Sequence, residues 1–197
     1  MLAAAAGVLV FAGIVLAFIY LRISESRVYD EDAEIFAPEI ALSPKSPGVL
    51  EAIYVTEGQT IPKNLVVARV GNELVKSKEA GLIILAAKET GKIVSPSDPV
   101  VTMIDPDELR VVARVEENKG LMRIEVGQKV VFTVDAFGSK KYQGIVDEIG
   151  ASSREAALAF NISDQRPTKE FNVKIRFNAS QYPELKNGMS AKVWIYR

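Results

Sequence analysis

The chain has 197 residues, enough for one sizeable domain or two small ones, and its 24 Lys and Arg nearly balance its 25 Asp and Glu. This balance, with no run of Lys or Arg, argues against a nucleic-acid-binding protein. The absence of Cys and His excludes disulfides, Zn sites built on thiolate or imidazole, and catalytic triads that need either side chain.

The N-terminal segment is apolar, and residues 1–21 contain no charged side chain. In a helix they span about 30 Å, the thickness of the hydrocarbon core of a bilayer, so we predict one transmembrane helix over residues 1–21. A cleaved secretory signal is the alternative, although no positively charged segment precedes the apolar run. Both interpretations carry the rest of the chain out of the cytoplasm.

Residues 22–40 are polar and mixed in charge, and we predict that they form a stalk leaving the membrane. Arg22 and Arg27 follow the apolar segment. By the positive-inside rule these two cations mildly favour the opposite orientation, with the bulk of the chain in the cytoplasm.

An internal repeat follows between residues 47 and 104. Gly48 and Gly58 of the first copy are ten residues apart, as are Gly81 and Gly91 of the second. The copies are offset by 33 residues, and after Gly91 the offset becomes 34 through an inserted residue. Each glycine is expected at a turn or at a close approach where a Cβ atom would not fit.

The repeat predicts two similar β-hairpin units, residues 47–70 and 81–104. Neither unit can bury its apolar face alone, so we expect them to pack together as a flattened sandwich over residues 41–105. The alternative is a chance similarity between two β-rich stretches.

Residues 106–197 show period-two alternation of apolar and polar side chains, and we predict a small antiparallel barrel or sandwich. A short helix is expected after the first strand, opened by Glu116 and Glu117 and ended by Gly127. Another turn is expected at Gly188. The alternating stretches are residues 109–115, 130–134, 156–162, 171–177 and 191–195.

Adjacent carboxylates such as Asp147 and Glu148 invite a hydrolase interpretation. Neighbouring side chains on a strand point to opposite faces, so these two are not expected to share a site. The spacing of acidic residues matches no Ca²⁺ loop, and no glycine-rich phosphate-binding motif occurs. We therefore predict a non-enzymatic protein with no catalytic residue, no metal site and no cofactor.

Three segments resemble bacterial membrane fusion proteins, also called periplasmic adaptor subunits, of the HlyD and EmrA type. Residues 46–70, SPGVLEAIYVTEGQTIPKNLVVARV, resemble the first half of the lipoyl- or biotinyl-type domain of that family. Residues 105–150 resemble its β-barrel, with a turn at Gly127-Gln128. Residues 183–197, PELKNGMSAKVWIYR, resemble the last loop and strand of that barrel.

The resemblance implies a protein of the cytoplasmic membrane, with its N-terminus inside and its bulk on the periplasmic side, and this implication overrides the weak charge rule. It implies assembly with an inner-membrane transporter for efflux or secretion and with further copies of the chain. Because the chain ends where the barrel ends, without the further domain of many RND adaptors, an ABC or major-facilitator transporter is expected in preference to an RND transporter.

The segment between the two half-motifs departs from the family pattern. Most members insert a long α-helical hairpin there, whose tip meets an outer-membrane channel. Residues 71–80 are too few for such a hairpin, which implies a short, hairpin-less variant and argues against contact with that channel.

Lipoyl and biotinyl carriers present one modified Lys at the turn between their halves. Lys76 or Lys78 would occupy that turn, so the alternative function is a membrane-anchored carrier subunit. The flanking residues do not match those of a carrier, and Glu73 and Glu79 nearby favour a solvated turn.

The last predicted strand carries Trp194 and Tyr196 on the face opposite Val193 and Ile195. One interpretation is that both faces of this closing strand are partly buried. The other is that the two rings contact the transporter or a neighbouring adaptor copy.

Overall fold

The computed structural model describes residues 13, 15, 27–155 and 169–196. In these ranges the fold is all-β, as predicted, with short 3-10 turns. The predicted transmembrane helix lies outside the described residues except for Gly13 and Val15, and no helix among the described residues is long and apolar enough to cross a bilayer. The chain divides into a barrel unit, Met1–Ile35, Arg110–Asn178 and Gly188–Arg197, and a sandwich unit, Phe36–Leu109 and Ala179–Asn187.

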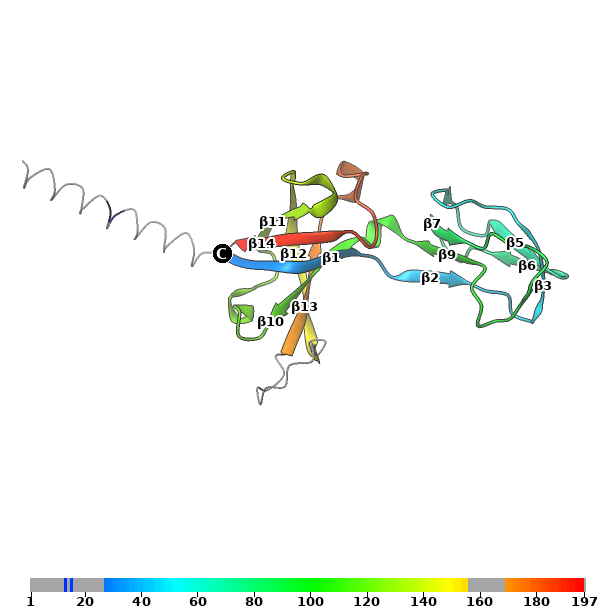
Figure 1. Ribbon diagram of the computed structural model, residues 1–197, viewed down its shortest axis with the longest axis horizontal. Helices are drawn as coiled ribbons and strands as arrows, with labels where there is room; N and C mark the ends of the chain where they lie inside the picture. Colours follow the sequence, from blue (N-terminus) through cyan, green and yellow to red (C-terminus); the bar gives the residue numbers. More distant parts are fainter. Residues whose placement is uncertain (1–12, 14, 16–26, 156–168, 197) are drawn as a thin grey trace, which may run out of the picture. The chain divides into compact units, whose positions relative to one another are not determined.

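The barrel unit contains a closed six-stranded barrel in the order β1-β10-β13-β12-β11-β14 (Figure 1). Antiparallel pairing of β1 with β14 completes it, so the barrel has no open sheet edge that could pair with another chain. The strands are β1 (Arg27–Phe36), β10 (Arg110–Glu116), β11 (Lys129–Val134), β12 (Lys141–Glu155), β13 (Lys169–Arg176) and β14 (Ser190–Tyr196).

Alternation along these strands fills the barrel with apolar side chains. Phe132 and Tyr142 are fully buried and stack with ring centroids 5.3 Å apart, and Phe177 packs on Phe132 at 5.6 Å. The strands predicted near residues 109–115, 130–134, 171–177 and 191–195 are confirmed. The one predicted over residues 156–162 lies outside the described residues.

The predicted stalk over residues 22–40 is wrong where the structure describes it. Residues 27–36 form β1, with Val28, Ala33 and Ile35 buried in the barrel. A β-bulge between Asp30 and Ala33 shifts the phase of the alternation. The inward positions are therefore five residues apart at this point, and the acidic residues between them hide the strand.

The predicted helix over residues 116–127 is also wrong. Glu116 is the last residue of β10, and only the 3-10 turn η2 (Leu121–Arg123) is helical. Gly120 has φ 110°, a left-handed conformation that interrupts a right-handed helix. The other 3-10 turns are η1 (Pro106–Glu108), η3 (Asp135–Phe137) and η4 (Ala179–Gln181).

The sandwich unit consists of two four-stranded sheets, β2-β9-β7-β4 and β6-β5-β3-β8. They enclose one apolar cluster that includes Leu50, Ile61, Val67, Ile83 and Met103. The strands are β2 (Glu39–Leu42), β3 (Gly48–Ile53), β4 (Thr60–Ile61), β5 (Val66–Val70), β6 (Glu73–Lys76), β7 (Gly81–Ala86), β8 (Ile93–Val94) and β9 (Val101–Ile104).

The repeat is visible in the hydrogen bonds between the two sheets' strands. The Gly58 amide donates to the Ile83 carbonyl at 2.8 Å, and the Gly91 amide donates to the Leu50 carbonyl at 2.7 Å. Adding 33 to one residue and subtracting 33 from the other converts the first bond into the second. Each half thus pairs its short strand with the long strand of the other half, β4 with β7 and β8 with β3.

The offset stays at 33 beyond Gly91, so the predicted inserted residue is wrong. The Tyr54 amide donates to the Val67 carbonyl, and the Ala87 amide donates to the Val100 carbonyl, both at 2.9 Å. Each of these residues in the second bond is 33 positions after its counterpart in the first.

The repeat also extends further than predicted, to β2 and β6. Leu42 of β2 pairs with Val101, and Val75 of β6 pairs with Ala68, again 33 positions apart. The segment joining the predicted halves therefore contains a strand of the second copy.

The glycines singled out in the sequence occupy two kinds of position. Gly58, Gly91, Gly127 and Gly188 have positive φ in turns. Gly48 and Gly81, in contrast, are not turn residues: they begin β3 and β7, where the neighbouring strand approaches closely.

Candidate interaction surface of the barrel

An aromatic patch lies on the outer face of the barrel, formed by Tyr29, Trp194 and Tyr196. Tyr29 of β1 is directly opposite Trp194 of β14, with ring centroids 5.2 Å apart and planes tilted by 33°. Tyr29 is 47% exposed, Tyr196 is 38% exposed and Trp194 is half-buried. Sequence analysis missed Tyr29, because it lies in the segment predicted to be a stalk.

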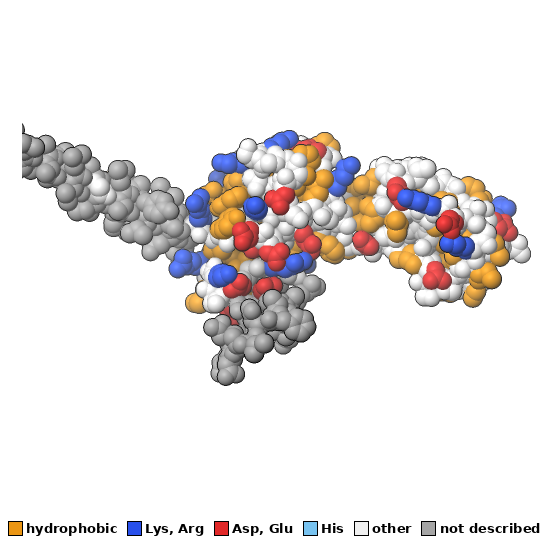
Figure 2. Space-filling model, viewed as in Figure 1, with side chains coloured by type: hydrophobic (Ala, Val, Ile, Leu, Met, Phe, Trp, Pro, Cys, Tyr) orange, Lys and Arg blue, Asp and Glu red, His pale blue; other side chains and the backbone are white. Residues whose placement is uncertain are grey.

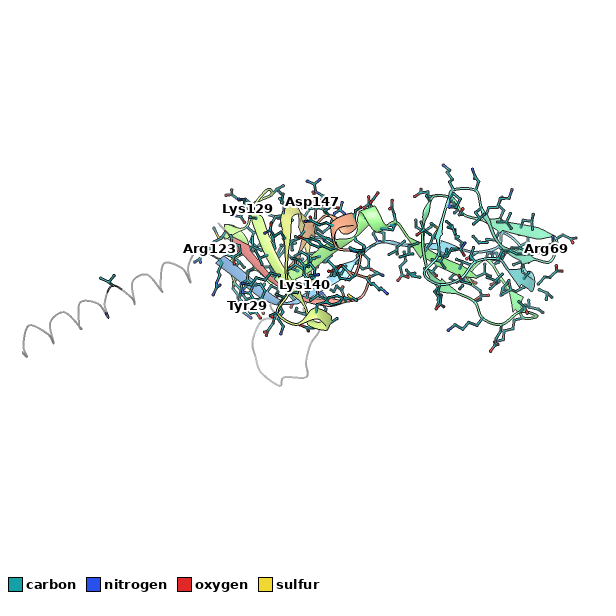
Figure 3. The ribbon with its side chains drawn as sticks, turned by 90° about the horizontal axis from the view of Figure 1, so that it is seen from above. Tyr29, Arg69, Arg123, Lys129, Lys140 and Asp147 are labelled. Atoms are coloured by element: carbon teal, nitrogen blue, oxygen red, sulfur yellow. The ribbon has the colours of Figure 1, made fainter. Side chains whose placement is uncertain are left out.

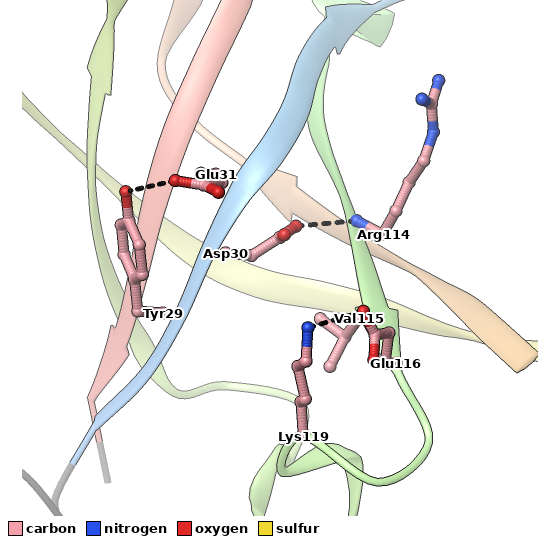
Figure 4. Close-up of a pocket in the computed structure, with 7 residues that line it drawn as sticks. All are labelled: Tyr29, Asp30, Glu31, Arg114, Val115, Glu116 and Lys119. Atoms are coloured by element: carbon pink, nitrogen blue, oxygen red, sulfur yellow. Dashed lines mark hydrogen bonds and ion pairs between the residues drawn. The ribbon is translucent and has the colours of Figure 1, made fainter. Parts of the chain in front are cut away.

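A pocket of about 200 Å³ adjoins this patch between β1 and β10 (Figure 4). Asp30 lies in it at the β-bulge, where its carboxylate accepts the Arg114 amide at 2.8 Å and the Asp32 amide at 3.2 Å. Burial raises the pKa of Asp30 above its usual value, and the two backbone hydrogen bonds oppose this effect.

The cations around the pocket are already paired with carboxylates. The Lys119 ammonium donates to Glu116 at 2.7 Å, and this bond raises the pKa of Lys119. The Arg114 guanidinium lies 2.9 Å from the Glu34 carboxylate and 3.6 Å from that of Asp32. These contacts bind β1 to β10, and we assign the pocket a structural role in closing the barrel.

A second charge cluster corrects the predicted orientation of Asp147 and Glu148. Asp147 lies 3.1 Å from Nε of Arg110 and 3.4 Å from Nε of Arg176, and Glu148 lies 2.9 Å from Nζ of Lys174. Lys174 and Arg176 are two residues apart on β13 and share a face. A bulge in β12 between Val146 and Glu148 therefore turns both carboxylates to the same outer face.

These carboxylates are arranged as ion pairs across strands, each facing a cation. Within residues 27–155 and 169–196, no group of three or more Asp or Glu is placed to hold a metal ion. Figure 3 shows Asp147 among the outward side chains of the barrel.

Lys76 and Lys78 do not lie at a hairpin tip. The tight turn between β5 and β6 is at Gly71-Asn72, whereas Lys76 is the last residue of β6. Between the two lysines, the buried Ser77 hydroxyl donates to the Pro62 carbonyl at 2.8 Å and accepts the Leu65 amide at 3.0 Å. This anchoring holds the segment against the sandwich, unlike the projecting turn of a carrier.

A duplicated lipoyl-like sandwich combined with a closed six-stranded barrel defines an adaptor of the membrane fusion class. Comparison with known proteins supports this class. Residues 109–195 match the YknX-like beta-barrel domain. The expected membership of the membrane fusion, or periplasmic adaptor, proteins is thereby confirmed.

One curated relative is "Putative efflux system component YhbJ" of Bacillus subtilis (strain 168), 30% identical over 134 residues. The match covers 66% of this chain and 57% of that protein, so the chain spans a little over half the length of its relative.

Two solved structures share the fold at low sequence identity. The periplasmic adaptor protein EmrA is 10% identical with a TM-score of 0.60, covering 87% of this chain and 99% of that one. A MacA-MexA chimeric protein containing the Pseudomonas aeruginosa MexA alpha-hairpin domain is 14% identical with a TM-score of 0.68, covering 87% and 81%. In this chain residues 71–80, all described, contain β6 and turns and no helix.

Proposed function

We propose that this chain is the non-enzymatic adaptor subunit of an efflux or secretion transporter. Residues 1–21 anchor it in the cytoplasmic membrane as a single span, with both β units on the extracytoplasmic side. The observation that carries the proposal is the duplicated sandwich with its closed barrel, the fold shared with EmrA. The name of the Bacillus relative, an efflux system component, supports the same role.

The chain works as an oligomer on an inner-membrane transporter of the ABC or major-facilitator type. The aromatic patch supplies part of the contact, because aromatic side chains with one exposed face are common at the centre of protein interfaces. Without a helical hairpin between β6 and β7, the adaptor acts at the inner membrane and does not reach an outer-membrane channel.

The proposal is tested by purifying the tagged full-length chain from its native membranes in mild detergent and identifying the recovered proteins by mass spectrometry. An inner-membrane transporter should co-purify. In Trp194→Ala its recovery should fall several-fold, because the ring lies on the outer face of the barrel and its loss leaves the core intact.

Tyr54→Ala is the matched control, since Tyr54 is 50% exposed on the sandwich unit. Both variants should keep the circular dichroism spectrum of the parent. Recovery of no transporter with the parent chain would contradict the adaptor role. Equal recovery with Trp194→Ala would remove the patch from the contact and leave the adaptor role in place.

A further inference from the structure

The loop between β10 and β11, residues 117–128, exposes apolar side chains to solvent. Met122 is 97% exposed and Val126 is 65% exposed. Ile145, opposite the first residue of β11, is exposed beside them. Single exposed apolar residues are ordinary on protein surfaces, so the location of this loop decides its meaning.

The loop lies at the end of the barrel where β1 begins. Gly120 approaches Val28 so closely that a Cβ atom on it would lie 3.0 Å from the valine side chain. The start of β11 also pairs with the end of β14, Val130 with Ile195. The first and last strands of the barrel and the loop therefore share one end, where Figure 3 shows Arg123 and Lys129.

The chain limits how far this end can be from the proposed anchor. Only five residues, 22–26, separate the uncharged segment from Arg27. Five residues span at most about 18 Å in any conformation. The loop thus lies within reach of the bilayer surface whenever the anchor is inserted.

The charge around the loop suits an anionic lipid surface. Arg27, Arg123 and Lys129 are exposed at this end, against Glu117 and Glu125, while Lys119 is paired with Glu116. Figure 2 shows Lys and Arg side chains gathered at the end of the barrel where β1 begins. Exposed apolar side chains flanked by cations are typical of segments that enter the interface of a membrane.

We propose that residues 117–128 dock the barrel on the lipid bilayer, with Met122 and Val126 in the headgroup region and Arg123 and Lys129 on anionic headgroups. The inference rests on the anchor in the proposed function. It fixes which end of the barrel faces the membrane.

The absence of Cys from the chain allows a direct test. Full-length Met122→Cys is spin-labelled and reconstituted in vesicles of phosphatidylcholine and phosphatidylglycerol without any transporter. The ratio of collisions with oxygen to collisions with a water-soluble nickel chelate should be several-fold higher at residue 122 than at a label on Ser139→Cys. Ser139 is exposed in the turn between β11 and β12, at the other end of the barrel.

Reversing the charge with Arg123→Glu and Lys129→Glu should bring the ratio at residue 122 towards that at 139. Equal ratios at 122 and 139 in the parent background overturn the inference. So does protection of residue 122 that appears only when a transporter is added, since the occupant is then a protein. A chain that fails to float with the vesicles overturns the anchor and the docking together, whereas co-purification tests the adaptor role separately.

Discussion

At the scale of single residues, Gly81 begins β7 where no side chain fits. A Cβ atom there would lie 2.5 Å from the carbonyl oxygen of Ile104 and would also overlap the Met103 side chain. At Gly48, the equivalent position of the first copy, the nearest atom is a methyl of Val70 at 3.0 Å, which can move. The two positions therefore form a matched pair.

We expect Gly81→Ala to lower the free energy of unfolding by about 2–3 kcal/mol, as overpacking against backbone does, and Gly48→Ala by about 1 kcal/mol or less. Urea unfolding followed by circular dichroism measures both variants. Equal losses would show that the clash at Gly81 is relieved by movement of the strands.

Asp30 should make the barrel more sensitive to pH in a direction opposite to that of most carboxylates. Burial raises its pKa in the folded state above the 3.8 of the unfolded chain. Its favourable contribution is therefore fully present below pH 3.8 and is lost as the pH rises through the folded pKa. The difference in unfolding free energy between the parent and Asp30→Asn should fall as the pH rises from about 3 to 7.

Asp98 is the control with the opposite sign. Hydrogen bonds from the Ser95 hydroxyl and amide lower its pKa, so its contribution is present above pH 3.8 and lost as the pH falls. NMR titration should give Asp30 a pKa above 3.8 and Asp98 a pKa below it. A depressed pKa for Asp30 would mean that its two backbone hydrogen bonds outweigh burial.

At the scale of elements, the duplication predicts that equivalent core residues contribute equally. Leu50 of β3 and Ile83 of β7 are each 1% exposed, and each carbonyl accepts the amide of the partner half's glycine. Leu50→Ala and Ile83→Ala should each destabilise the sandwich unit by about 2–5 kcal/mol, through lost transfer energy and the cavity left behind.

The control is Ile93→Ala, because Ile93 is 79% exposed and its truncation should change stability by less than about 0.5 kcal/mol. Thermal unfolding of the three variants gives the comparison. A large loss for only one of the two core variants would mean that the halves do not share the core equally.

The elements that could be predicted are those whose alternation is unbroken. β11 and β14 alternate from end to end, and the sequence therefore predicts them directly. β1 and β12 each contain a bulge, which shifts the inward positions by one residue. The bonds that fix Asp30 could not be predicted, because Arg114 is 84 residues away in the sequence and belongs to a different strand.

At the scale of the whole molecule, the barrel unit is assembled from three separate segments around the sandwich unit. The sequence predicts a simple order of stalk, sandwich and barrel, because local patterns do not report which distant strand closes a barrel. β1 supplies that closure by pairing with β14, and the Gly188 amide donates to the Ile35 carbonyl where the strands meet. The strand that follows the proposed anchor is therefore part of the barrel itself.

This organisation predicts different outcomes for two N-terminal deletions. Removing residues 1–26 deletes the proposed anchor but keeps β1, so the protein should be recovered as a monodisperse soluble species after a salt wash of the membranes. Removing residues 1–36 also deletes β1, which exposes the edges of β10 and β14 and uncovers the apolar interior that Val28, Ala33 and Ile35 close. We expect this second protein to aggregate and to lose the near-ultraviolet dichroism of the barrel aromatics, as size-exclusion chromatography and spectroscopy would show. If it remained monodisperse with the parent spectrum, β1 would not be required for closure, and if the first protein stayed in the membrane after the wash, residues 1–26 would not be the anchor.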